Sequence, residues 1–145
     1  MEAMPHLYSA VVSGKPEGSL TLSSKQMPGI DVSPPEQFGG PSDEWSPEEL
    51  LMASLSSCLV LSFRAIAKFS TLEWSSIDCE SNGTLDKVER KTQFTSVTSV
   101  VKLVVTSGES VEKAKRLLQK AEESCFISNS LACDTHLDCD VIVIE

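Results

Sequence analysis

Residues 46–68 read SPEELLMASLSSCLVLSFRAIAK, and this stretch predicts the central element of the 145-residue chain. Ser46 and Glu49 match the capping-box pattern of a helix start, and Pro47 suits the first helical position. The residues after them include no glycine or proline and are apolar on nearly every face, whereas a surface helix has one apolar stripe. The serines and the acidic first turn argue against a membrane span, which needs about 20 apolar residues. We therefore predict a long central helix buried by protein, with Cys58 at its middle.

The composition limits the class of protein. Apolar residues make up 41% and charged residues 23% of the chain, fractions that are ordinary for one globular domain. The net charge of −9 argues against binding to nucleic acid or to an anionic membrane, because both need clustered Lys and Arg. Residues 1–10, MEAMPHLYSA, have no basic segment followed by an apolar run, so we expect no signal peptide and a cytoplasmic protein. In that compartment the five cysteines are expected to be thiols, transient disulfides or ligands.

The order of patterns along the chain predicts an α+β fold in a single domain, 1–145. Residues 1–33 should form a β-hairpin or meander, and a loop rich in proline and glycine at 34–43 leads to the central helix. Residues 71–145 should supply the other strands and a second helix at 111–123, which has one apolar face. Strand patterns occur on both sides of the central helix, at 6–13, 19–24, 30–32, 71–85, 92–105 and 135–144.

The apolar character of the central helix also bears on assembly. A chain of this size rarely encloses a helix of more than twenty mostly apolar residues on all sides. A second subunit is the simplest source of the missing cover. We therefore predict an obligate homodimer.

Two cysteine motifs resemble those of a known family. Residues 47–58, PEELLMASLSSC, are similar to the N-P-E-x-L-x-x-A-x-x-x-C signature of the OsmC/Ohr family, and residues 125–131, CFISNSL, are similar to its second motif, C-P-[IV]-S-x-x-L. The order of elements matches that family over nearly the whole chain. The resemblance implies an OsmC-like fold, in which antiparallel sheets wrap around the long buried central helix of an intertwined homodimer with active sites at the subunit interface.

The resemblance also implies a function, that of a peroxidase acting on organic hydroperoxides and less well on hydrogen peroxide. Cys58 would attack the O–O bond and become a sulfenic acid, and Cys125 would resolve that acid as a disulfide. A dithiol reductant, such as a lipoylated protein, would restore both thiols. No metal and no bound organic cofactor would be needed.

Further site residues follow from the same resemblance. Glu48 matches the orienting carboxylate of the family signature, and Lys15 is the cation nearest to the position of the family's arginine, although lysine lacks the planar fork of arginine. Glu48 also fits a carboxylate that is favoured at any helix N-terminus. Phe38, Trp45 and Phe126 are candidate walls of an apolar substrate pocket between the subunits.

Other interpretations fit the same residues. By position alone Cys58 also fits a small apolar residue of the core, since cysteine is among the most buried residue types. One rival function is a dimer without catalysis that holds a fatty-acid-like ligand. Another is a redox sensor, in which a disulfide between Cys58 and Cys125 alters a partner surface.

The run Cys133-x-x-His136-x-x-Cys139 contains types of residue that bind metals. It offers three ligands, and His136 and Cys139 would point to opposite faces of a regular strand. We therefore expect no metal site. Cys79 lies in a strand pattern and is expected to be a packing residue.

Overall fold

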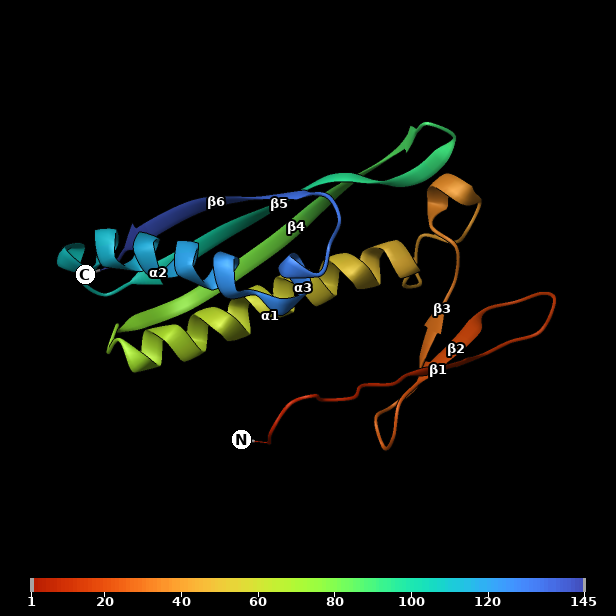
Figure 1. Ribbon diagram of the computed structural model, residues 1–145, viewed down its shortest axis with the longest axis horizontal. Coiled ribbons are helices and arrows are strands. Elements are labelled where there is room, and N and C mark those ends of the chain that lie inside the picture. Colours follow the sequence, from red (N-terminus) through yellow and green to blue (C-terminus); the bar gives the residue numbers. More distant parts are fainter. Residues whose placement is uncertain (1, 145) are drawn as a thin grey trace. The chain divides into compact units, whose positions relative to one another are not determined.

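Residues 2–144 are described by the structure, a computed structural model. Their elements follow the α+β order that the sequence predicts (Figure 1). The chain divides into two compact units, residues 1–51 and 52–145, with the division inside the central helix. The assignment of the whole chain to one domain stays a prediction.

The first unit contains a small antiparallel sheet of three strands in the order β1-β2-β3. Its strands are β1 (Val11–Ser13), β2 (Leu20–Ser23) and β3 (Ile30–Val32). Strands β1 and β2 form the predicted hairpin, but β1 is shorter than the predicted 6–13. One turn of 3₁₀ helix, η1 (Glu36–Phe38), lies in the loop rich in proline and glycine.

Hydrogen bonds join this sheet to the segment before the central helix. The backbone amide of Ser33 donates to the carbonyl of Trp45 at 2.9 Å. The hydroxyls of Ser19 and Ser33 donate to the Glu44 carboxylate at 2.5 and 3.0 Å. The end of β3 and the start of β2 are therefore both tied to the residues that lead into the helix.

Helix α1 (Pro47–Phe69) is the central helix, and both of its ends are defined by local hydrogen bonds. At its start, Ser46 Oγ accepts from the Glu49 amide at 3.2 Å and donates to Glu49 Oε1 at 3.1 Å, which confirms the capping box. At its end, the Leu72 amide donates to the Ala67 carbonyl at 2.9 Å, and Thr71 has a positive φ of 53°. This is a Schellman ending with threonine where glycine is usual.

The second unit contains a sheet in the order β4-β5-β6. Strands β4 (Trp74–Val88) and β5 (Lys91–Val105) form a long antiparallel hairpin. Its loop consists of Glu89 and Arg90, with φ of 50° and 73°, as a type I′ turn requires.

Strand β6 (Asp134–Val143) pairs with β5 in parallel, with Ser96 opposite Asp134. This differs from the predicted antiparallel sheets, because α2 (Val111–Ser124) carries the chain back along the sheet before β6 begins. Such a crossover is what a parallel pair needs. The short helix α3 (Phe126–Asn129) lies between α2 and β6.

The main core lies between one face of this sheet and the two long helices (Figure 1). Alternate residues of β5 point into it, as the period of a strand requires. Helix α2 contributes the apolar face that its sequence predicts, and α1 contributes one stripe with a spacing of four residues. The buried members of this core are Leu59, Phe63, Ala67, Leu72, Val101, Leu103, Val105, Ala114, Leu117, Leu118 and Ala121.

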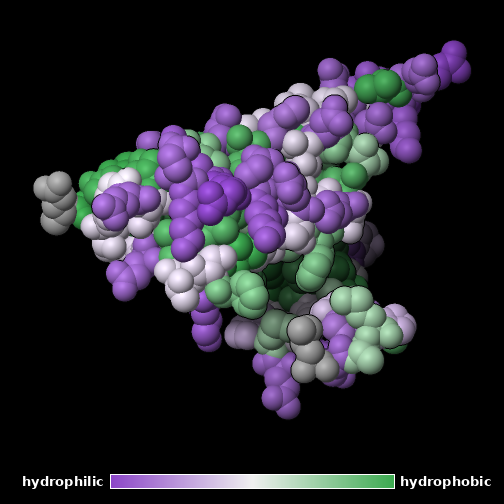
Figure 2. All heavy atoms as spheres, turned by 60° about the vertical axis from the view of Figure 1, so that its left-hand side comes forward, coloured by the Kyte–Doolittle hydropathy of each residue, from purple (hydrophilic) through white to green (hydrophobic). Residues whose placement is uncertain are grey.

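Burial of α1 within one chain is limited to that stripe. The buried residues of α1 are Leu55, Leu59, Phe63 and Ala67. Leu61 is 57% exposed and Phe69 is 92% exposed, and Figure 2 shows other apolar side chains that reach the surface among charged ones. The predicted burial on all sides is therefore not met by a single chain, because the sheet covers one side of the helix. Helix α1 is long and apolar enough to cross a membrane, a property that some core helices share. That the protein does not bind a membrane stays a prediction.

Candidate active site

Cys58 and Cys125, which are far apart in sequence, lie together in the second unit. Cys58 is half-buried in the middle of α1, and Cys125 is fully buried at the N-cap of α3. Cys58 packs against the small buried cluster that contains Cys125. The structure thus brings together the two cysteines that the sequence motifs select.

The hydrogen bonds around Cys58 favour its thiolate. The groups that lower the pKa of Cys58 are the backbone amides of Ile127 and Phe126, the Cys125 thiol and the Ser62 hydroxyl. Burial raises the pKa of Cys58, but the bonds from Ile127, Cys125, Phe126 and Ser62 more than offset burial, so the pKa lies below its ordinary value. A lowered pKa and partial access are two features of a reactive cysteine, and Cys58 has both.

Cys125 is affected in the opposite direction. Burial raises its pKa to about 11, although the backbone amide of Ser128, which donates to its sulfur at 3.5 Å, acts against burial. The neighbouring Cys58 raises the pKa of Cys125 further. At neutral pH Cys125 is therefore a protonated thiol that can serve as the hydrogen-bond donor to a Cys58 thiolate.

A small apolar cluster surrounds the two sulfur atoms. It is separate from the main core and comes from α1, β5 and the segment that includes α3. Its members are Met52, Leu55, Cys58, Val97, Cys125, Ile127, Leu131 and Cys133. Sequence reasoning missed most of this cluster and Ser62 as well, although Ser62 lies four residues after Cys58 and hence on the same helix face.

The three residues predicted to line a substrate pocket are not among the residues packed around the cysteine pair. Phe126 is 73% exposed, and its backbone amide is among the groups that lower the pKa of Cys58. Phe38 and Trp45 are exposed residues of the first unit, whereas the cysteine pair belongs to the second. Their role as walls stays a prediction.

Glu48 and Lys15 also belong to the first unit. Glu48 lies in the first turn of α1, and its Oε1 is buried without a hydrogen-bond partner among residues 2–144. Ten residues of helix, about 15 Å of rise, separate it from Cys58. Lys15 lies in the turn between β1 and β2, beside an open pocket of about 320 Å³, and forms no ion pair within the described part of the chain.

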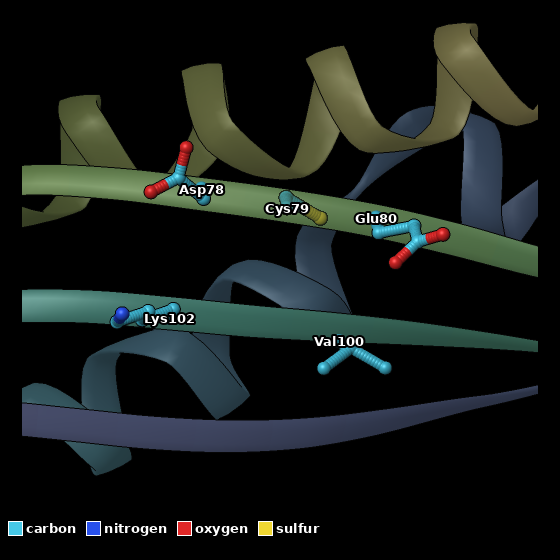
Figure 3. A pocket seen from close by; sticks show the side chains of 5 residues that line it. All are labelled: Asp78, Cys79, Glu80, Val100 and Lys102. Carbon is cyan, nitrogen blue, oxygen red and sulfur yellow. The ribbon is translucent and has the colours of Figure 1, made fainter.

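Cys79 and Cys139 are half-buried cysteines of the sheet, and each lies opposite Val101 in its strand pairing. Burial raises the pKa of both thiols, and a nearby carboxylate, Glu122 for Cys79 and Asp138 for Cys139, adds to the effect. Cys79 lines an open pocket of about 270 Å³. Figure 3 shows Cys79 between Asp78 and Glu80, whose carboxylates also line this pocket. Neither cysteine has the lowered pKa of a nucleophile.

The candidate ligands in the run from Cys133 to Cys139 are not brought together on one face of β6. His136 is exposed while Cys139 is half-buried, so the two side chains face opposite sides of β6 as predicted. Within residues 2–144 no three side chains of His, Cys, Asp or Glu gather as a metal would require. Cys133 lines a surface pocket of about 370 Å³ that also contains Val88 and Phe94.

Fold and site together define a class of protein: an α+β thiol protein whose central helix presents one cysteine to a second cysteine at a short helical turn. The family model described as OsmC-like protein matches residues 40–140. The chain belongs to this OsmC-like family, which confirms the resemblance of its two cysteine motifs.

Relatives and solved structures agree with this assignment. The uncharacterised protein YmaD of Bacillus subtilis is 27% identical over 115 residues, which are 77% of each chain. An OsmC-like protein of unknown function from Vibrio cholerae superposes with a TM-score of 0.86 at 24% identity, covering 94% of this chain and all of that one. The organic hydroperoxide resistance protein OhrB of Bacillus subtilis gives 0.69 at 24% identity, covering 93% of this chain and all of its own. These likenesses confirm the OsmC-like fold class.

Proposed function

We propose that this protein is a cysteine-based peroxidase that reduces organic hydroperoxides, and hydrogen peroxide less well. The observation that carries the proposal is the contact between Cys58 and Cys125, in which the pKa of Cys58 is lowered and that of Cys125 is raised. A thiolate next to a protonated thiol is the arrangement that attack and resolution need. The printed name of OhrB, an organic hydroperoxide resistance protein, supports the class of substrate.

The first step is attack of the Cys58 thiolate on one peroxide oxygen. The S–O bond forms, the O–O bond breaks, and the alkoxide that leaves takes a proton and becomes an alcohol. The amides of Ile127 and Phe126 stabilise the thiolate before the attack. Cys58 is then a sulfenic acid, oxidised by two electrons.

In the second step the Cys125 sulfur attacks the sulfenic sulfur of Cys58. The S–S bond forms, and the hydroxyl leaves as water with the proton that the Cys125 thiol gives up. An external dithiol, such as a lipoylated protein, then reduces the disulfide by thiol–disulfide exchange. The dithiol is oxidised to a disulfide, and both protein thiols are restored. These steps use no metal and no bound organic cofactor.

We also propose that the active unit is a homodimer that uses the exposed apolar side of α1, including Leu61. In that dimer Glu48, whose Oε1 has no partner among residues 2–144, would orient Lys15 as the cation that supports the Cys58 thiolate. Phe38, Trp45 and Phe126 would line the apolar substrate pocket. The acidic net charge supports a cytoplasmic protein that binds neither nucleic acid nor a membrane.

Consumption of cumene hydroperoxide and of hydrogen peroxide, each with a dithiol reductant, tests the proposed function. The protein should consume the organic peroxide faster, and Cys58→Ser should abolish consumption. Cys79→Ser is the matched control, since it removes a half-buried cysteine whose pKa is raised, and it should keep activity. Full activity of Cys58→Ser would refute the proposal. No consumption by an intact protein with free thiols would favour the protein that only binds an apolar ligand.

A further inference from the structure

A buried carboxylate outside the cysteine pair is tied to the helix that contacts Cys58. Glu122, on α2, is 8% exposed, and its Oε1 accepts hydrogen bonds from the Ser128 hydroxyl at 3.0 Å and from the Thr135 hydroxyl at 2.7 Å. The two hydroxyl oxygens lie 2.9 Å apart. One carboxylate therefore joins α2, α3 and β6 at a single point.

This point of attachment matters because α3 is short. Its four residues, Phe126–Asn129, form too few internal hydrogen bonds to be stable alone, so contacts with the rest of the fold must fix its place. The Ser128 hydroxyl donates a hydrogen bond to the Glu122 carboxylate and so ties α3 to α2. The Ser128 amide donates to the Cys125 sulfur. The same short helix contains Ile127, which packs in one cluster with Cys58, and the amides of Ile127 and Phe126 lower the pKa of Cys58.

We propose that Glu122 is a positioning residue, which holds α3 through Ser128 and so keeps the amides of Phe126 and Ile127 directed at the Cys58 sulfur. Glu122 acts through these residues and does not touch the reacting sulfur atom. The benefit for catalysis rests on the proposed peroxidase function. The ionisation of Cys58, in contrast, can be measured without any peroxide.

The cysteines near Glu122 allow the effect of its hydrogen bonds to be distinguished from the effect of its charge. Among the described residues, Cys125 is the titratable group that contacts Cys58, and Cys79 on β4 is a thiol whose pKa the Glu122 charge raises. A change that removes the charge but keeps an acceptor oxygen should therefore affect Cys79 and leave Cys58 as it is.

The experiment compares Glu122→Ala with Glu122→Gln in the full chain. The alkylation rate of each cysteine is followed against pH by mass spectrometry of its peptide. Alanine removes the acceptor, so the pKa of Cys58 should rise by about one unit and its alkylation at neutral pH should slow about tenfold. Glutamine keeps an oxygen for both hydroxyls and should restore the behaviour of Cys58. The pKa of Cys79 should fall in both variants, because both lack the charge.

An unchanged pKa of Cys58 in Glu122→Ala would overturn the proposal. An equal rise of this pKa in Glu122→Gln would overturn it too, because it would show that the charge of Glu122 and not its hydrogen bonds is responsible. If Glu122→Ala does not fold, Ser128→Ala cuts the same link and leaves Glu122 bound to Thr135. It should also raise the pKa of Cys58, and an unchanged pKa would again refute the role. If the unmodified protein does not turn over peroxide, the proposed function is refuted. The role of Glu122 is still tested, because the pKa of Cys58 is measured by alkylation without peroxide.

Discussion

Cys58 packs against the cluster that contains the buried Cys125, and the two cysteines have pKa values displaced in opposite directions. The difference arises because the amides of Phe126 and Ile127 and the Ser62 hydroxyl surround Cys58, whereas burial dominates at Cys125. The pair is therefore asymmetric, and Cys58 is the cysteine whose thiolate forms at the lower pH.

The pH dependence of thiol alkylation should show this asymmetry. The thiolate is the form that reacts, so each rate rises as pH passes through the pKa of that thiol. The lowered pKa of Cys58 moves its rise to lower pH, while Cys125 stays mostly protonated until about pH 11. Iodoacetamide labelling in a series of buffers, read by peptide mass spectrometry, measures both curves. Coincident curves would contradict the difference.

Replacement of the second cysteine should stop the cycle after its first step. In Cys125→Ser, peroxide should still oxidise Cys58, but the sulfenic acid has no thiol to condense with. Dimedone should then label Cys58 after a single equivalent of cumene hydroperoxide, and no internal disulfide should form. An internal disulfide that includes Cys58 in this variant would show that another cysteine resolves it.

The buried stripe of α1 should contribute strongly to stability. Leu59→Ala should lower the free energy of unfolding by about 2–5 kcal/mol, because Leu59 is fully buried in the main core. Urea unfolding followed by circular dichroism measures the change. Leu85→Ala on the exposed part of β4 is the control and should cost less than about 1 kcal/mol. Equal losses would mean that the packing of α1 differs from the structure.

The exposed side of α1 gives a test of the dimer. Leu61→Asp places a charge on an apolar side chain that the proposed partner would cover, so it should shift the protein toward monomer. Sedimentation velocity measures the change in mass. Gln119→Asp, on the exposed face of α2, adds the same charge elsewhere and should leave the mass unchanged. A dimer that persists in Leu61→Asp would place the interface on another surface.

The end of α1 offers a stabilising substitution. Thr71 has φ of 53°, a conformation that costs a non-glycine residue about 1 kcal/mol or more. Thr71→Gly should therefore raise the free energy of unfolding by about 1 kcal/mol, even though it removes the bond from the Thr71 hydroxyl to the Ser70 carbonyl. Thr71→Ala keeps the strain and serves as the comparison. Thermal unfolding of both variants measures the difference.

Much of the fold could be predicted from local patterns. The capping residues Ser46 and Glu49 fixed the start of α1, and the β-branched run at 92–105 corresponds to β5. The direction of β6 could not be predicted, because alternation along a strand does not say whether its neighbour is parallel or antiparallel. The covering of α1 likewise depends on surfaces that the sequence of one helix does not describe.

The candidate site could be predicted in part. The two motifs select Cys58 and Cys125, which the structure places in contact. The amide donors of Phe126 and Ile127 have no side-chain signature, so no pattern could reveal them. Glu122 resembles any charged residue of an amphipathic helix until the fold places it against Ser128 and Thr135.

The parallel pairing of β6 has a consequence for how the chain folds. The β4–β5 hairpin closes through a two-residue turn and involves neighbours in sequence, so it can form early. The β5–β6 ladder, which joins Ser96 to Asp134, must wait until the whole α2 segment has folded back, because closing a long loop costs entropy before its contacts are made. Cys125 lies within that returning segment. The contact of Cys125 with Cys58 should therefore be among the last to form, so a partly folded chain would hold the two thiols apart and could not join them in a disulfide.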